Sequence, residues 1–358
     1  MEFAFSLLIY FLILQFIANN GREFIDKVLG YYVIFVSFVI LNLFRIYAQQ
    51  IFPDIPNYEH IFASTSALKF DLKSGFSLNQ YSSSVEIGFS IFISIFKIFS
   101  ENFSIFLFFI CLIELAVFYC FCKKYRIDLV NAFPIYIALT YVTFQIGILR
   151  QALACCLFLI GLIYINKKFI FILLGLLAFT FHRSAACWLL LFWVDRVFNR
   201  KILYIIIVSA VLVYLVKFDL YQFISSYSFY LEDILIGDRI AYYLYERENA
   251  YLGIGFWDRI FLLIMMNLAY RDLQLKNKIN SRNNIIYNLG TVVLVLQMVL
   301  FSSPSLTSRL RFYFSIFPVI FLSEYINLEL RNRLRSLFRF ILVLYLMFHV
   351  YLKGTYLL

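Results

Sequence analysis

Residues 147–188 read GILRQALACCLFLIGLIYINKKFIFILLGLLAFTFHRSAACW, two apolar runs that a short basic turn at residues 166–168 separates. Apolar runs of this length form helices that cross, or nearly cross, a hydrocarbon core of about 30 Å. The pattern predicts a transmembrane hairpin with its basic turn on one face of the membrane. Arg150 and His182 then lie together on the opposite face, where they either extend to the lipid headgroups or serve a function.

The composition extends this interpretation to the whole chain. Of the 358 residues, 63% are hydrophobic and 15% are charged, and apolar runs recur from end to end. These values are typical of an all-α, polytopic membrane protein, so we expect residues 1–358 to form a single integral membrane domain. The formal charge of +10 falls in short clusters between the runs, which favours a role in membrane orientation over nucleic-acid binding. The six cysteines lack the spacing of a zinc or disulfide framework, so we expect neither a metal nor a cofactor.

About twelve spans of roughly 15 to 20 residues follow from the apolar runs. They are residues 3–18, 29–48, 103–122, 129–147, 151–166, 168–182, 184–198, 202–217, 256–270, 284–301, 309–326 and 336–352. Lysine and arginine clusters occur at alternate turns and should face the cytoplasm, which places both termini and the long loops 49–102 and 218–255 outside. This orientation depends on the short seventh span, 184–198. If that segment does not cross the membrane, every later loop lies on the opposite side.

Residues 85–99 form an apolar segment inside the first external loop. A crossing there would export the basic turn that begins at Lys123, and the segment is only about 22 Å long as a helix, so we expect a re-entrant or interfacial helix. Glu86 stands at its N-terminus. A carboxylate there either caps the helix, which contributes about 0.3–1 kcal/mol, or points into a cavity and takes part in chemistry.

Charged residues gather at the predicted external ends of the spans. They are Arg45, Arg150, His182, Arg183, Arg309 and Arg311, with Asp54, Asp71 and Glu86 in or beside the first loop. The guanidinium forks of several arginines suit a diphosphate-linked lipid, although pairing with the loop carboxylates would explain them without a ligand. The sequence has no nucleotide-binding glycine motif, metal-ligand cluster or Ser-His-Asp order, so an activated substrate would have to supply the energy of the reaction.

Five short motifs, taken in order, resemble those of the EpsG-like family of bacterial polysaccharide polymerases, which are related in role to the Wzy-type O-antigen polymerases. The motifs are Asp54-Ile-Pro-Asn-Tyr58, Val85-Glu86-Ile87-Gly88-Phe89, Arg150-Gln-Ala-Leu-Ala154, Phe181-His182-Arg183-Ser184-Ala185 and Arg309-Leu-Arg311-Phe-Tyr313-Phe314. Ile87 stands where the family has a proline, so the turn that presents Glu86 could differ.

The resemblance implies a glycosyltransferase that moves a growing glycan from undecaprenyl diphosphate to another lipid-linked repeat unit, outside the bacterial inner membrane. The ligands would be the undecaprenyl-diphosphate-linked oligosaccharide and membrane lipids, and the implied partners are a flippase and a chain-length regulator. The product would be an O-antigen, a capsule or an exopolysaccharide.

Each charged residue receives a role in this interpretation. Arg150, and after it Arg309, would bind the departing diphosphate and stabilise its charge without a metal. His182 would either accept the acceptor's proton or donate a hydrogen bond to phosphate, because histidine titrates near neutral pH. Glu86 or Asp54 would orient or deprotonate the acceptor. The remaining predicted substrate contacts are Arg45, Tyr58, Arg183, Arg311 and Tyr313.

Other functions stay open at this point. A different lipid-linked glycosyltransferase or a ligase would use the same residues. A lipid-linked oligosaccharide flippase would be expected to have two homologous halves, and no internal repeat is evident in the sequence. A membrane acyltransferase would also use a membrane-embedded histidine, and it would need a route for an acyl donor.

Overall fold

The computed structural model describes residues 54–67, 69–71, 75–77, 85–145, 147–189, 254–279, 281–299, 311–328 and 340–348, with residue 338 and scattered helical positions between 32 and 46 and between 204 and 212. The chain divides into two compact units. The first comprises Met1–Trp188 with Ile326–Leu358, and the second comprises Leu189–Tyr325. The single membrane domain expected over the whole chain stays a prediction.

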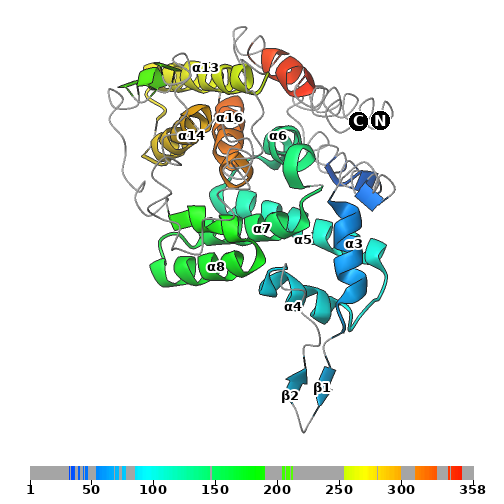
Figure 1. Ribbon diagram of the computed structural model, residues 1–358. Helices are drawn as coiled ribbons and strands as arrows, with labels where there is room; N and C mark the ends of the chain where they lie inside the picture. The colour runs from blue at the N-terminus through cyan, green and yellow to red at the C-terminus, as the bar shows by residue number, and fades with distance from the viewer. Residues whose placement is uncertain are drawn as a thin grey trace. The chain divides into compact units, whose positions relative to one another are not determined.

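The predicted hairpin is present in the first unit as α7 (Leu149–Ile163) and α8 (Lys168–Phe181), which pack along one another (Figure 1). Trp188 is the side chain that fills the space between them. A Cβ atom on Gly161 or Gly175 would lie 3.0 Å from the Trp188 ring, so both glycines make room for the indole. The basic turn therefore joins two helices whose spacing is set by one buried aromatic side chain.

Helix α5 (Phe103–Tyr125) packs against α7 and is the longest apolar helix of the described residues. It begins at Asn102, whose Oδ1 atom accepts hydrogen bonds from the backbone N–H groups of Ser104 at 2.8 Å and Ile105 at 3.2 Å. It ends at Arg126, which has a left-handed φ of 54°. Its 23 residues extend about 34 Å, enough to cross a bilayer core. It is the one helix of the described residues that is long and apolar enough to cross by itself.

The predicted span 129–147 is observed as two consecutive pieces, α6 (Leu129–Tyr136) and a π-helix at Ile137–Gln145. Pro134 lies inside α6 and has no N–H to donate to the preceding turn, which disfavours a regular α-helix through this region. Tyr136 stacks on Phe118 of α5, with ring centroids 3.9 Å apart, and this contact holds the segment against α5.

The loop predicted at residues 49–102 contains helices and a small β-hairpin. Its helices are α3 (Ile55–Ser64) and α4 (Ile87–Phe96), and its strands β1 (Lys69–Asp71) and β2 (Gly75–Ser77) pair antiparallel with Phe70 opposite Phe76 (Figure 1). The hairpin is an addition to the all-α fold that the sequence predicted. Helix α4 extends only about 15 Å, half of a hydrocarbon core, and its re-entrant or interfacial placement stays a prediction.

The second unit contains α13 (Ile254–Leu275), α14 (Ser281–Val299) and most of α16 (Ile316–Leu328), which ends in the first unit. The three helices correspond to the predicted spans 256–270, 284–301 and 309–326. Tyrosine and asparagine side chains connect α13 to α14. Tyr270 donates to Asn284 at 2.9 Å, and Tyr287 donates to Asn267 at 2.6 Å.

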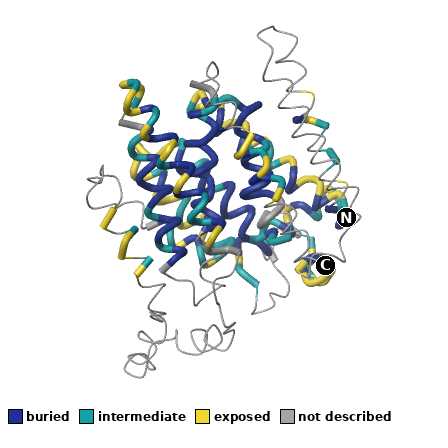
Figure 2. The backbone as a smooth tube through the Cα atoms, turned by 90° about the horizontal axis from the view of Figure 1, so that it is seen from above, coloured by how far each residue is buried: buried dark blue, intermediate teal, exposed yellow. Residues whose placement is uncertain are grey.

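Buried and exposed residues alternate in stripes along the helices (Figure 2). On α8, the large apolar residues Phe169, Leu173 and Leu176 are exposed, whereas Phe171 and Ala178 are buried. Helix α8 thus packs on the protein with one face and exposes apolar side chains on the other. An exposed apolar face of this kind suits contact with a bilayer.

Several predicted segments lie wholly or largely outside the described residues. They are the spans 3–18, 29–48 and 202–217, the loop 218–255, and the part of span 184–198 that follows residue 189. Span 336–352 is described as helical at residues 338 and 340–348. The beginning of span 184–198 is a 3-10 helix, Arg183–Leu189. The total of about twelve spans stays a prediction.

Candidate functional site

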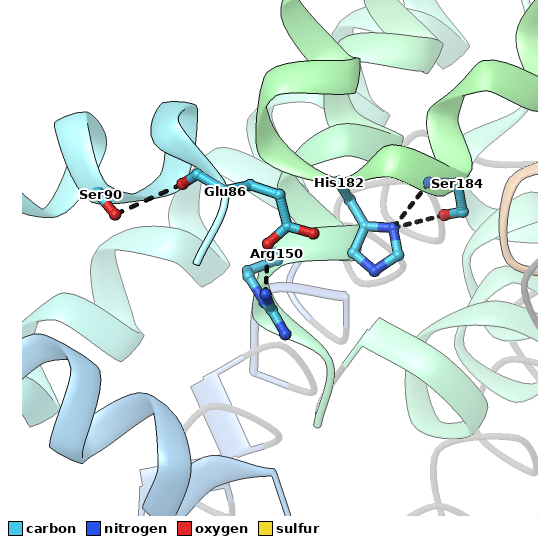
Figure 3. A network of polar contacts seen from close by, with 5 residues as sticks. All are labelled: Glu86, Ser90, Arg150, His182 and Ser184. Carbon is cyan, nitrogen blue, oxygen red and sulfur yellow. Dashed lines mark hydrogen bonds and ion pairs between the residues drawn. The ribbon is translucent and has the colours of Figure 1, made fainter. Parts of the chain in front are cut away.

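An ion pair between Arg150 and Glu86 is the centre of the candidate site (Figure 3). Arg150 is the second residue of α7, and its Nη1 atom donates to Oε2 of Glu86, the residue that precedes α4. The two side chains are 26% and 16% exposed, so the pair is sheltered and still open to solvent. Glu86 makes no side-chain hydrogen bond that caps α4. Its carboxylate binds the arginine instead of a backbone N–H of the helix, and it still lies at the N-terminal end of α4, where the helix dipole favours a negative charge.

Tyr58 covers another side of the Arg150 guanidinium. The centre of the guanidinium lies 5.6 Å from the centroid of the tyrosine ring, which suits a cation–π contact. Burial raises the pKa of Tyr58, and the positive charge of Arg150 opposes this shift. Burial acts to lower the pKa of Arg150, but Tyr58 and Glu86 outweigh it, so the guanidinium stays charged. Arg150 is thus a fixed cation held between an aromatic ring and a carboxylate.

Asp54 lies one turn before Tyr58 at the beginning of α3. The backbone N–H of Tyr58 donates to the carbonyl oxygen of Asp54 at 3.1 Å, and the Asp54 side chain is exposed. Its charge adds to the rise in the pKa of Tyr58. The predicted Asp-x-x-x-Tyr motif therefore places an open carboxylate next to the tyrosine that contacts Arg150.

His182 follows the last residue of α8 and has an ordered ring. Its Nδ1 atom accepts a hydrogen bond from the backbone N–H of Ser184 at 3.2 Å and lies 2.6 Å from the Ser184 hydroxyl. Because Nδ1 is an acceptor, the neutral ring carries its proton on Nε2. The side chains of His182, Glu86 and Arg150 lie close together in Figure 3.

Gly88 explains how α4 reaches this end of α8. A Cβ atom at position 88 would overlap Thr180, lying 2.8 Å from its carbonyl oxygen and 2.9 Å from its carbonyl carbon. Only glycine allows so close an approach of the two backbones. Since Thr180 is two residues from His182 and Gly88 is two residues from Glu86, this contact brings the histidine and the carboxylate to the same place.

Arg45 differs from the prediction that it contacts substrate at the membrane surface. Its side chain is fully buried, and its Nη1 atom lies 3.2 Å from Oε2 of Glu114, in the middle of α5. The same nitrogen donates to the Cys111 thiol at 2.8 Å, and that sulfur lies 3.3 Å from the Tyr141 hydroxyl. A charge so deeply buried requires a partner, and Glu114 supplies it. The sequence contained a signal for this pair, since Glu114 is a lone carboxylate in an apolar span.

The other predicted contacts are distributed over both units. Arg183 is exposed at the start of the 3-10 helix. In the second unit, Arg311 pairs with Asp258 at 2.9 Å, and Tyr313 is fully buried. Arg309 lies outside the described residues. Within the described part of the chain, no group of three or more His, Cys, Asp or Glu side chains could hold a metal ion.

Comparison with known proteins gives one match. A family model described as the EpsG family matches residues 33–357, which is nearly the whole chain. No curated protein and no solved structure matches the sequence.

Proposed function

The chain belongs to the EpsG family, a family of membrane proteins of the polysaccharide-polymerase type, and we propose that it polymerises lipid-linked repeat units. The donor is a glycan on undecaprenyl diphosphate, and the acceptor is the non-reducing end of a second lipid-linked unit. The reaction takes place on the external face of the bacterial inner membrane, in which the chain is a multi-pass protein. The product is an O-antigen, a capsule or an exopolysaccharide.

The observation that carries this proposal is the environment of Arg150. A cation held at a helix end by Tyr58 and Glu86, and partly open to solvent, is suited to an anionic headgroup. Arg183, which follows His182, is exposed and adds positive charge to the same end of the α7–α8 hairpin.

The chemistry of transfer requires charge stabilisation and a base. The bond between the sugar's anomeric carbon and the diphosphate oxygen breaks, and the bonding electrons leave with the diphosphate. The acceptor hydroxyl forms the new bond to the anomeric carbon, and its proton passes to a carboxylate. Arg150 stabilises the charge that grows on the departing diphosphate, and a preorganised contact of this kind contributes about 3–4 kcal/mol.

His182 is better suited to hydrogen-bond phosphate than to act as the base. Its Nδ1 atom already accepts from Ser184, so the neutral ring carries its proton on Nε2 and is a hydrogen-bond donor there. The base is then Glu86 or Asp54. Glu86 is the closer to Arg150, and it becomes available when the diphosphate takes its place on the guanidinium.

Deletion and complementation test the proposal. A strain that lacks this gene should make single lipid-linked repeat units and no long polymer, and the wild-type gene should restore the polymer. Arg150→Ala at the same membrane level should not restore it. Normal polymer in the deletion strain would refute the polymerase assignment, and accumulation of units on the cytoplasmic face would instead support a flippase.

A further inference from the structure

Helices α3 and α4 contact one another through aromatic side chains at two places. Near their N-terminal ends, the rings of Tyr58 and Phe89 lie 5.7 Å apart. Near their C-terminal ends, the rings of Phe62 and Phe96 lie 6.3 Å apart. The two helices also meet at Arg150, which Tyr58 of α3 and Glu86, the residue before α4, both contact.

Lys97 joins the opposite ends of the two helices. It follows the last residue of α4, and its Nζ atom donates to the carbonyl oxygen of Thr65 at 2.6 Å and lies 3.4 Å from that of Ala63. The last carbonyls of a helix have no partner within the helix, so α3 gains donors that its own backbone does not provide. The ammonium also lies 4.7 Å from the centroid of the Phe62 ring.

Lys97 is half-buried, and its ammonium is directed to the C-terminal end of α3. It is the one charged residue of the run 87–99, and a lysine there would be expected to extend to the lipid headgroups. Instead, the ammonium lies on the C-terminal end of α3, where the helix dipole favours a cation. Phe62 is buried among Phe96, Phe103 and Phe106, so the contact with Lys97 is made to a rigid side chain.

We propose that Lys97 is a positioning residue for glycosyl transfer, because it fixes the C-terminal ends of α3 and α4 and thereby sets where Tyr58 and Glu86 meet Arg150. The inference rests on the proposed function, since the residues that it positions are those assigned to the diphosphate and the base. Lys97 itself touches neither substrate. Its loss would let the two helices separate by a fraction of an ångström, which lowers the rate more than it lowers binding.

The test compares Lys97→Met, which removes the charge and keeps most of the length, with Lys97→Arg, which keeps a donor. Lys124→Met is the matched control, because Lys124 is an exposed lysine at the end of α5. Transfer is measured with purified protein and a synthetic lipid-diphosphate-linked repeat unit. We expect Lys97→Met to lower kcat about tenfold with KM changed less than about twofold. We expect Lys97→Arg to recover most of the rate and Lys124→Met to have no effect.

A double-mutant cycle separates positioning from general stability. In a Glu86→Gln background, Lys97→Met should lower kcat less than about twofold, because the carboxylate that it positions is gone. Equal effects in both backgrounds, or a loss of folded protein with kcat unchanged, would overturn the inference and leave the proposed function intact. If wild-type protein transfers nothing from the lipid diphosphate, the proposed function fails, and the role of Lys97 fails with it.

Discussion

Arg150 and Glu86 form an ion pair although 64 residues separate them along the chain. Pairing with loop carboxylates would explain the arginines at the helix ends without a ligand, and Arg150 and Glu86 are such a pair. The same pair has a chemical consequence, because it neutralises the cation to which a diphosphate would bind. In the proposed mechanism a diphosphate displaces Glu86 from Arg150, and its arrival frees a carboxylate at the moment when the acceptor hydroxyl has to lose a proton.

This competition predicts that Glu86→Gln binds a diphosphate more tightly and reacts more slowly. Release of a partly exposed ion pair should tighten binding about two- to fivefold, and loss of the base should lower turnover by on the order of 10²-fold or more. Calorimetry with inorganic pyrophosphate measures binding, and the transfer assay measures turnover. Glu101→Gln is the control, since Glu101 is an exposed carboxylate beyond α4. Weaker binding by Glu86→Gln would contradict the competition.

A second prediction separates charge from geometry at Arg150. A lysine supplies the charge but not the planar fork that makes two parallel hydrogen bonds to a diphosphate. Arg150→Lys should therefore lose about 3–4 kcal/mol of transition-state stabilisation, a factor of about 10²–10³ in rate. Polysaccharide chain length in the complemented deletion strain reports this loss at matched membrane levels. Normal polymer from Arg150→Lys would show that Arg150 is only an anchor at the headgroups.

Sequence patterns predicted the elements better than their contacts. The α7–α8 hairpin was predictable because two uninterrupted apolar runs flank a basic turn, and Arg150 and His182 were found because each stands at the end of a run. The pairing of Glu114 with Arg45 and the approach of Gly88 to Thr180 were missed, since these contacts depend on how distant segments pack. The contact of His182 with Ser184 is local, and it was also missed. The β-hairpin at 69–77 was missed because its strands have only three residues each, too few for a period to be visible.

A third prediction concerns the buried pair of Arg45 and Glu114. Arg45→Met alone leaves Glu114 buried without its cation, which should destabilise the protein by about 3–5 kcal/mol. The double variant Arg45→Met, Glu114→Leu removes both charges and should regain most of that stability and the transfer activity. Thermal unfolding in detergent and the transfer assay measure the two quantities. A double variant that is stable but inactive would indicate that Arg45 contacts the substrate.

The orientation of the α7–α8 hairpin gives a fourth prediction. Lys167 and Arg183 are exposed residues at opposite ends of α8, whose fourteen residues extend about 21 Å. In a chain without its native cysteines, Arg183→Cys should react with an impermeant thiol reagent added outside, and Lys167→Cys should react only after the membrane is opened. The reverse pattern would place the candidate site in the cytoplasm and remove the polymerase mechanism.

The last prediction compares Ile87 and Gly88, the first two residues of α4. Glu86 has an extended backbone, with φ −65° and ψ 137°, which is the conformation favoured before a proline, and Ile87 is the first residue of the helix and 54% exposed. Ile87→Pro, the family's residue, should therefore keep the turn that presents Glu86, retain activity and stabilise the protein by about 0.4–1 kcal/mol.

Gly88→Ala should do the opposite, since the new methyl group meets the Thr180 backbone, and overpacking of this kind costs about 1–3 kcal/mol. Transfer rates and unfolding temperatures of the two single variants, measured side by side, test whether this turn and this approach present Glu86. If Ile87→Pro inactivates the enzyme while Gly88→Ala does not, Glu86 is presented by some other turn, and the approach of α4 to His182 is not what builds the site.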